Sequence, residues 1–223
     1  EINDREDLWD FSIAIEPFTR TKQETLYETK VSISISKVAE KQLRTKISFT
    51  IENSKIEIIY NNDAIESTIA TNTKYGNTFE FSAQIIREHG ALFPLNLRGL
   101  KIIKNENNIK QYTLTNPIPT EAITHLIKHL TPYHHGSKKQ STLRDECETL
   151  SIQHQNELRK SLGKLFTRDK QFQKIFGTEH EKITDICFTI LLAKGLNRLL
   201  ISADKLFTDF FSGVRYQGPL RAA

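Results

Sequence analysis

Four histidines form the densest set of side chains that could do chemistry in this sequence. They are His125, His129, His134 and His135. Neutral imidazoles four residues apart lie side by side on a helix, where they can share a zinc, copper or nickel ion. A metal-dependent or hydrolytic enzyme is therefore one hypothesis. The simpler alternative is a solvated helix face, because neither an HExxH pattern nor a cysteine pair accompanies the histidines.

A run of basic residues follows the histidines and could bind an anionic partner. It comprises Lys138, Lys139, Arg144, Arg159, Lys160, Lys164, Arg168, Lys170 and Lys174. These side chains could neutralise the phosphates of a nucleic acid, with Phe166, Phe172 or Phe176 stacking on unpaired bases. They could equally contact an acidic protein surface. Two simpler explanations remain, since the phenylalanines recur at the spacing of a helix core and lysines are favoured near helix C-termini.

A third set of polar residues interrupts the most apolar stretch of the chain. It comprises Asp185, Thr189, Lys194, Asn197 and Arg198. Polar groups inside a core must be paired, and their pKa values can be displaced, so they are candidates for a hidden site. A structural pair between the aspartate and a lysine or arginine is the simpler interpretation.

Several signatures of common enzymes do not occur in the sequence. There is no GxSxG elbow, Walker loop, GxGxxG, HExxH, paired CxxC or EF-hand loop. The two cysteines, Cys147 and Cys187, fit neither a disulfide framework nor a zinc spacing. We expect buried thiols in a reducing compartment such as the cytoplasm, with one bridge between packed helices as the alternative.

The first half of the chain predicts an antiparallel sheet that would position these groups. Its apolar and polar residues alternate two by two, as in strands with one buried and one solvated face. Residues 52–54 suit a hairpin turn, and a short helix is expected over residues 83–89. Strands are expected at 9–15, 31–35, 47–51, 55–60, 78–81, 100–103 and 109–115.

The second half of the chain predicts helices, which begin after a proline-rich connector at residues 116–119. No helix is expected before Thr120, because prolines occupy two of the connector positions. A mobile loop is expected at residues 133–141. The pair Thr178 and Glu181 predicts a capping box. Helices are expected at 120–131, 142–166, 172–176 and 178–211, the last apolar on every side and therefore central.

The combined pattern predicts an α+β protein. An antiparallel β-rich domain of five to seven strands with one short helix would occupy residues 1–116, and a helical domain of four or five helices would occupy residues 117–223. The second part holds the excess charge, because residues 118–223 carry 16 basic and 11 acidic groups whereas residues 1–117 carry 15 and 16. No apolar run is long enough for a membrane span, so we expect a soluble protein.

The leading functional hypothesis is a non-enzymatic module that binds a protein partner. The basic helical half, the loop at 133–141 or a free sheet edge would supply the contact surface. A nucleic-acid-binding protein is the second hypothesis, and the histidine-based enzyme is the third. The chain starts at Glu1 and contains no methionine, so we expect a processed form or a piece of a longer protein.

Overall fold

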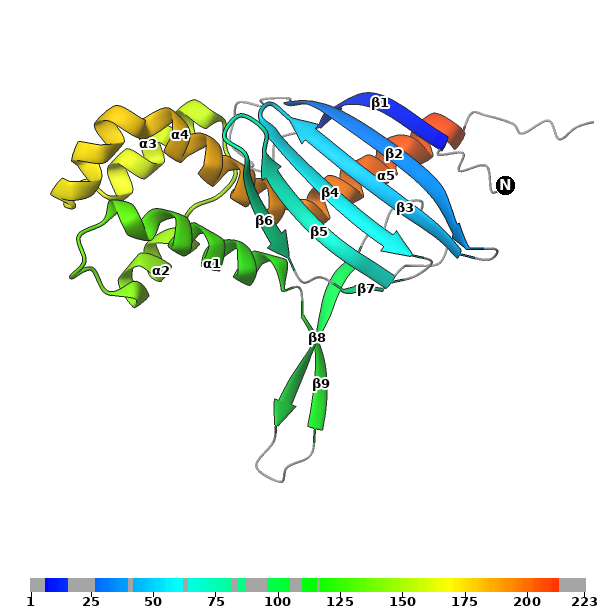
Figure 1. The fold of residues 1–223 in the computed structure, drawn as a ribbon, viewed down its shortest axis with the longest axis horizontal. Coiled ribbons are helices and arrows are strands. Elements are labelled where there is room, and N and C mark those ends of the chain that lie inside the picture. The colour runs from blue at the N-terminus through cyan, green and yellow to red at the C-terminus, as the bar shows by residue number, and fades with distance from the viewer. Residues whose placement is uncertain are drawn as a thin grey trace, which may run out of the picture.

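The computed structural model describes residues 7–15, 27–39, 42–61, 64–81, 84–86, 96–104, 110–115 and 117–212. Within these residues, nine strands come first and five α-helices with one 3-10 turn follow (Figure 1). This order confirms the predicted α+β class. The change from strands to helices falls between β9 and α1.

The main sheet contains six strands that pair in the order of the sequence, each antiparallel to the next. Val31, Phe49 and Ile58 lie on its buried face, whereas Lys46 and Glu57 form an ion pair on the other face. The alternation of apolar and polar residues is therefore confirmed for the central strands. The strands are β1 Asp7–Ile15, β2 Tyr27–Ala39, β3 Gln42–Ile51, β4 Ser54–Asn61, β5 Ala64–Asn72 and β6 Asn77–Phe81.

A second sheet contains three antiparallel strands, β7 Gln84–Ile86, β8 Asn96–Lys104 and β9 Lys110–Thr115. The hairpin of β8 and β9 is the one that the sequence predicts. The short helix expected over residues 83–89 is wrong at its centre, because β7 pairs there with β8. The pairing of β7 with β8 outweighs the helix-favouring local sequence of residues 83–89. The rest of that segment lies outside the described residues.

The turn between β3 and β4 contains two residues, Glu52 and Asn53. Glu52 has a φ angle of 50°, in the left-handed region that tight hairpin turns require. This turn confirms the predicted hairpin.

The helices are α1 Ile118–Leu130, α2 Gln140–Glu148, α3 Gln155–Leu165, α4 Lys170–Lys194 and α5 Leu196–Ser212, with the 3-10 turn η1 at Thr131–Tyr133. Two of the predicted helices have wrong boundaries. Helix α1 starts two residues before Thr120, because a proline is tolerated in the first turn, where its missing N–H has no helical partner. The single helix expected over 142–166 is two helices. Leu150 and Ile152 are buried in the segment between them.

Helix α4 consists of two helical segments that meet at a kink, one residue after the position where the sequence predicts a new helix. Asp169 caps it, since its Oδ1 accepts a hydrogen bond from the backbone N–H of Phe172 at 3.0 Å. The predicted capping box is wrong, because the Thr178 hydroxyl donates to the Ile175 carbonyl instead. The break itself lies at Glu179, whose backbone is not helical (φ −111°, ψ 16°).

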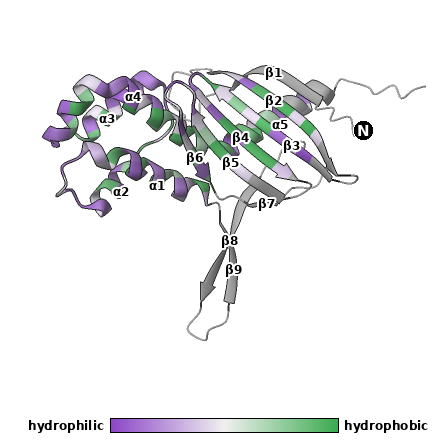
Figure 2. Ribbon diagram, viewed as in Figure 1, coloured by the Kyte–Doolittle hydropathy of each residue, from purple (hydrophilic) through white to green (hydrophobic). Residues whose placement is uncertain are grey.

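The C-terminal half of α4 lies at the centre of the molecule. Helix α4 as a whole packs against β4, β5, α1 and α3. Every residue from Ile183 to Ala193 is buried, as the apolar pattern predicts. Gly195 then separates α4 from α5, and α5 runs across the same face of the main sheet toward β1 (Figure 1). Figure 2 shows the matching hydrophobic stripes on the strands and helices.

No single helix within the described residues combines the length and hydropathy needed to cross a membrane. Helix α4 and the first part of α5 meet that test only together, and they are bent by 63° with respect to each other.

Candidate functional site: a polar cavity beside α4

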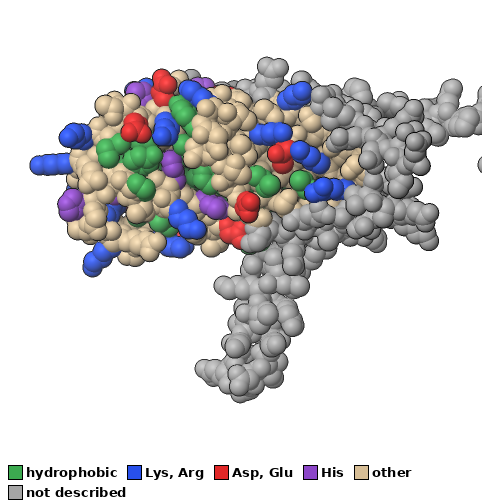
Figure 3. All heavy atoms as spheres, viewed as in Figure 1, with side chains coloured by type: hydrophobic (Ala, Val, Ile, Leu, Met, Phe, Trp, Pro, Cys, Tyr) green, Lys and Arg blue, Asp and Glu red, His purple; other side chains and the backbone are tan. Residues whose placement is uncertain are grey.

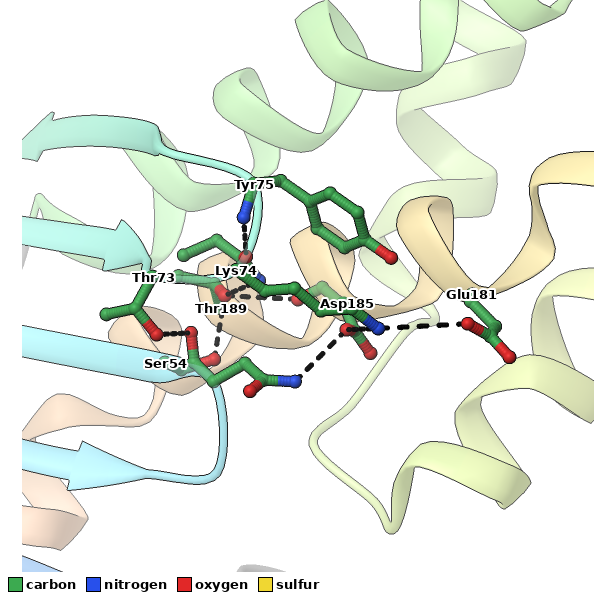
Figure 4. A network of polar contacts seen from close by, with 9 residues as sticks. Ser54, Thr73, Lys74, Tyr75, Glu181, Asp185 and Thr189 are labelled. Atoms are coloured by element: carbon green, nitrogen blue, oxygen red, sulfur yellow. Dashed lines mark hydrogen bonds and ion pairs between the residues drawn. The ribbon is translucent and has the colours of Figure 1, made fainter.

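A row of polar side chains lies on the buried face of the main sheet, next to its β3–β4 and β5–β6 turns. Ser54 and Asn72 are cross-strand neighbours in this row. Both meet Thr189 of α4, with Ser54 Oγ at 2.7 Å and Asn72 Nδ2 at 3.1 Å from its hydroxyl oxygen. Thr189 donates its own proton to the Asp185 carbonyl, so Ser54 and Asn72 are the donors to Thr189 (Figure 4). The row therefore joins the sheet to the central helix.

The carboxylate of Asp185 lies one helical turn before Thr189 and is 7% exposed. Its Oδ2 accepts a hydrogen bond from Asn53 Nδ2 at 3.3 Å and lies 3.7 Å from Lys74 Nζ. The same Lys74 ammonium is 3.7 Å from Glu181 (Figure 4). Burial raises the pKa of the Asp185 carboxyl above its usual value, and Lys74 and Asn53 act in the opposite direction.

Asp185 and the three side chains around its carboxylate, those of Asn53, Lys74 and Glu181, border a cavity of about 290 Å³. Besides the two turns and α4, the first turns of α3 line it and contribute Arg159. Thr184 of α4 also lines it. That side chain is 3% exposed, and its hydroxyl oxygen has no hydrogen-bond partner among the described residues. All the described residues around the cavity are polar or charged.

Of the five polar residues predicted to form a hidden site on the apolar helix, only some lie together in the structure. Asp185 and Thr189 come together, and Asp185 has a lysine partner, as the simpler interpretation expects. That partner is Lys74 from a sheet turn. Lys194 lies elsewhere and donates to the Leu150 carbonyl at 3.0 Å. Asn197 and Arg198 follow in the first turn of α5.

The sequence reasoning did not identify the sheet residues of the site. Ser54 falls in the turn expected at residues 52–54, and no strand is expected around Asn72, so the sequence indicates an inward position for neither. Asn53 and Lys74 lie in exposed turns, and nothing in their local sequence sets them apart.

The first two histidines of the cluster do not face solvent together. His125 Nε2 donates to the Glu80 carbonyl at 2.9 Å, and its ring lies against Phe79 and Phe81 of β6. His129 is half-buried, and its Nε2 has no hydrogen-bond partner in the described part of the chain.

The last two histidines bind different partners again. Nδ1 of the buried His134 donates to Asp169 Oδ2 at 2.7 Å, and Nδ1 of His135 lies 2.7 Å from the Ser137 hydroxyl. Among the described residues, no group of three or more His, Cys, Asp or Glu side chains is placed to hold a metal ion. The geometry therefore gives no support to the metal-site hypothesis.

The buried position of His129 predicts a pH effect on stability. Burial, together with nearby Lys182, lowers the pKa of His129 from 6.5 to about 4. Between these values the unfolded chain binds a proton that the folded chain does not, so stability falls as the pH drops from about 6.5 to about 4. We expect a loss of about 3 kcal/mol from this residue.

Denaturant unfolding of the wild type and of His129→Gln across this pH range measures the effect. The difference in unfolding free energy between the two proteins should shift by that amount. Parallel pH profiles would show that His129 does not titrate in this way.

The predicted basic residues fall into two groups. Lys138 is engaged, because its Nζ lies 2.6 Å from Glu146 and over the ring of Phe166. The other eight are exposed, and Lys160 pairs with Glu157 at 2.7 Å. The phenylalanines proposed to stack on bases are in the core instead. Phe166, Phe172 and Phe176 are all buried.

The cysteines are free and buried, as predicted. Burial raises the pKa of Cys147 to about 12 and also raises that of Cys187, so neither thiol is a ready nucleophile at neutral pH. Comparisons of the chain with protein-family models, with curated proteins and with solved structures find no match.

Proposed function

We propose that the protein is a non-enzymatic interaction module that binds an acidic protein partner through a basic surface at the corner between α3 and α4. The basic surface consists of Lys160, Lys164, Arg168, Lys170 and Lys174. All five side chains are exposed, and only Lys160 has an acidic partner in the described part of the chain. Figure 3 shows Lys and Arg side chains projecting from the helical end of the molecule.

The positions of Lys170 and Lys174 carry the proposal. They lie in the first two turns of α4, where the helix dipole is positive and acidic residues are the favourable choice. The dipole explains Lys164 at the end of α3, but it opposes the two lysines on α4. Cations that oppose the dipole and lack ion pairs leave a local positive field, which favours an acidic partner.

The two other surfaces considered from the sequence have less support. In the loop at 133–141, His134 is hydrogen-bonded to Asp169 and Lys138 forms an ion pair with Glu146, so these two side chains are already engaged. The edge strand β6 packs against α1, and its Glu80 carbonyl accepts a hydrogen bond from His125. Nucleic acid is the weaker alternative partner, because the phenylalanines that would stack on bases are buried.

A charge-reversal experiment tests the basic surface. The wild type should bind a poly-glutamate peptide at low salt and lose affinity as salt rises. The variant Lys164→Glu, Arg168→Glu, Lys174→Glu should bind at least about tenfold more weakly, since three favourable contacts become repulsive. Fluorescence anisotropy of a labelled peptide measures both effects.

A matched variant with the same change of charge is Lys128→Glu, Lys182→Glu, Lys205→Glu, whose three lysines are exposed on other surfaces. It should keep most of the affinity. Equal losses in the two variants would contradict a localised surface. If the wild type bound a nucleic acid duplex more tightly than the peptide, the basic surface would be a nucleic-acid-binding surface.

A further inference from the structure

We propose that the polar cavity beside α4 binds a small zwitterionic molecule of the α-amino-acid class. This site uses residues outside the basic surface and does not depend on the proposed protein partner. The two assignments can therefore fail separately.

The size and lining of the cavity limit the ligand. Its volume of about 290 Å³ is just below the range of about 300–1,000 Å³ that is usual for ligand pockets, so the ligand must be compact. The described lining residues are polar or charged, without an apolar side chain. A lipid or an aromatic molecule would find no apolar wall there, whereas a small polar molecule would find many hydrogen-bonding groups.

The charges around the cavity favour a ligand with one cationic and one anionic group. Asp185 and Glu181 line it from α4, and Arg159 lines it from α3. In the described part of the chain, Arg159 forms no ion pair or hydrogen bond, so its guanidinium does not meet either carboxylate. A ligand ammonium can approach the carboxylates while a ligand carboxylate binds the guanidinium. Lys74 also lines the cavity and lies 3.7 Å from each carboxylate, so the lining carries two cations and two anions. A ligand without net charge that carries one group of each sign keeps this balance.

The start of α3 adds to the anionic side of the site. Gln155 and Asn156 of its first turn line the cavity, and helix N-termini favour anionic groups because their first backbone N–H groups have no helical partner. One of these N–H groups, that of Asn156, donates to His154 Nδ1 at 3.3 Å. A carboxylate near Arg159 would be stabilised by the helix as well as by the guanidinium.

Thr184 gives an independent indication of a ligand. Its side chain is buried and lines the cavity, yet its hydroxyl oxygen has no hydrogen-bond partner in the described residues. A buried hydroxyl without a partner is unfavourable. A polar ligand in the cavity would supply the missing hydrogen bond.

The test is isothermal titration calorimetry of the purified protein with L-serine and L-asparagine as probes, at concentrations up to about 10 mM. Both are compact and polar. We expect measurable binding of at least one of them. N-acetyl-L-serine, which lacks the cation, and L-serinamide, which lacks the carboxylate, should each bind at least about tenfold more weakly than L-serine.

Two variants separate ligand binding from folding. Thr184→Val should weaken binding several-fold without lowering the unfolding temperature, because the hydroxyl that it removes has no partner in the protein. Arg159→Gln changes an exposed side chain and should weaken binding about tenfold while poly-glutamate binding is largely retained. Lys164→Gln serves as the control and should leave amino-acid binding unchanged.

Absence of heat with both amino acids would overturn the proposal, and so would affinities that are the same in the wild type, Thr184→Val and Arg159→Gln. Equal affinity for L-serine and its two blocked forms would also contradict a zwitterion site. None of these results bears on the basic surface.

Discussion

Replacing Phe172 by alanine is expected to lower the free energy of unfolding by about 4 kcal/mol. The ring is fully buried and lies in a group of four rings, with centroids 4.9 Å from His134, 4.6 Å from Phe166 and 5.1 Å from Phe176. Truncating a buried phenylalanine leaves a cavity and typically costs 3–5 kcal/mol, to which lost ring contacts add. Urea unfolding followed by circular dichroism measures the change.

The conservative variant Phe172→Leu is the control. It keeps most of the volume and should cost about half as much or less. The alanine variant should also expose His134, whose pKa is lowered mainly by burial, so NMR titration should show that pKa moving upward. A loss below about 1 kcal/mol for alanine would mean that the ring group does not hold α4 against the 3-10 turn.

Replacing Thr189 by valine is expected to lower the free energy of unfolding by about 3 kcal/mol. Valine has nearly the same shape, so no cavity forms, but the hydroxyl that joins the sheet to α4 is lost. The Ser54 hydroxyl and the Asn72 amide then remain buried without this acceptor. Each buried polar group left unsatisfied costs about 1–3 kcal/mol.

Two other substitutions test whether the hydroxyl is responsible. Thr189→Ser keeps it and removes one methyl group, which should cost about 1 kcal/mol. Thr178→Val lies on the same helix, where the exposed hydroxyl bonds only to the Ile175 carbonyl, and should change stability by about 0.5 kcal/mol or less. If valine and serine at position 189 were equally destabilising, the polar row would not hold the two layers together.

The sheet could be predicted from the sequence wherever its buried face is apolar. Strand β4 has Ile56 and Ile58 pointing inward, and its alternation is clear. Strand β5 was missed because its inward residues are Thr68, Ala70 and Asn72, which do not form an apolar stripe. One of these residues, Asn72, belongs to the row that meets α4.

The helical half could be predicted in content but less well in its boundaries. Apolar spacing identified the helices, but helix ends depend on contacts with distant residues. The Lys194 ammonium, for example, binds carbonyls of Glu148 and Leu150 at the end of α2, where the sequence predicts continuous helix. Such contacts leave no mark in the local sequence.

The candidate site was half predicted for a similar reason. Asp185 and Thr189 stand out as polar residues in an apolar helix, so the sequence indicates that something must pair with them. Their partners come from turns that are distant in sequence, and Asn53 is 132 positions from Asp185. Only the register of the antiparallel strands brings those turns together, and that register is not readable from either turn alone.

The tethering of the two sheet turns has a practical consequence for labelling the protein. Tips of hairpins are usually good places to insert an epitope or a fluorescent reporter. Here Thr73 of one tip donates to the Asn53 carbonyl of the other at 2.8 Å, and both tips are bonded to α4. An insertion at either tip would disturb the hydrogen bonds that join the tips to each other and to α4. Gly136, which is exposed and has open space around it, is a better place for such an insertion.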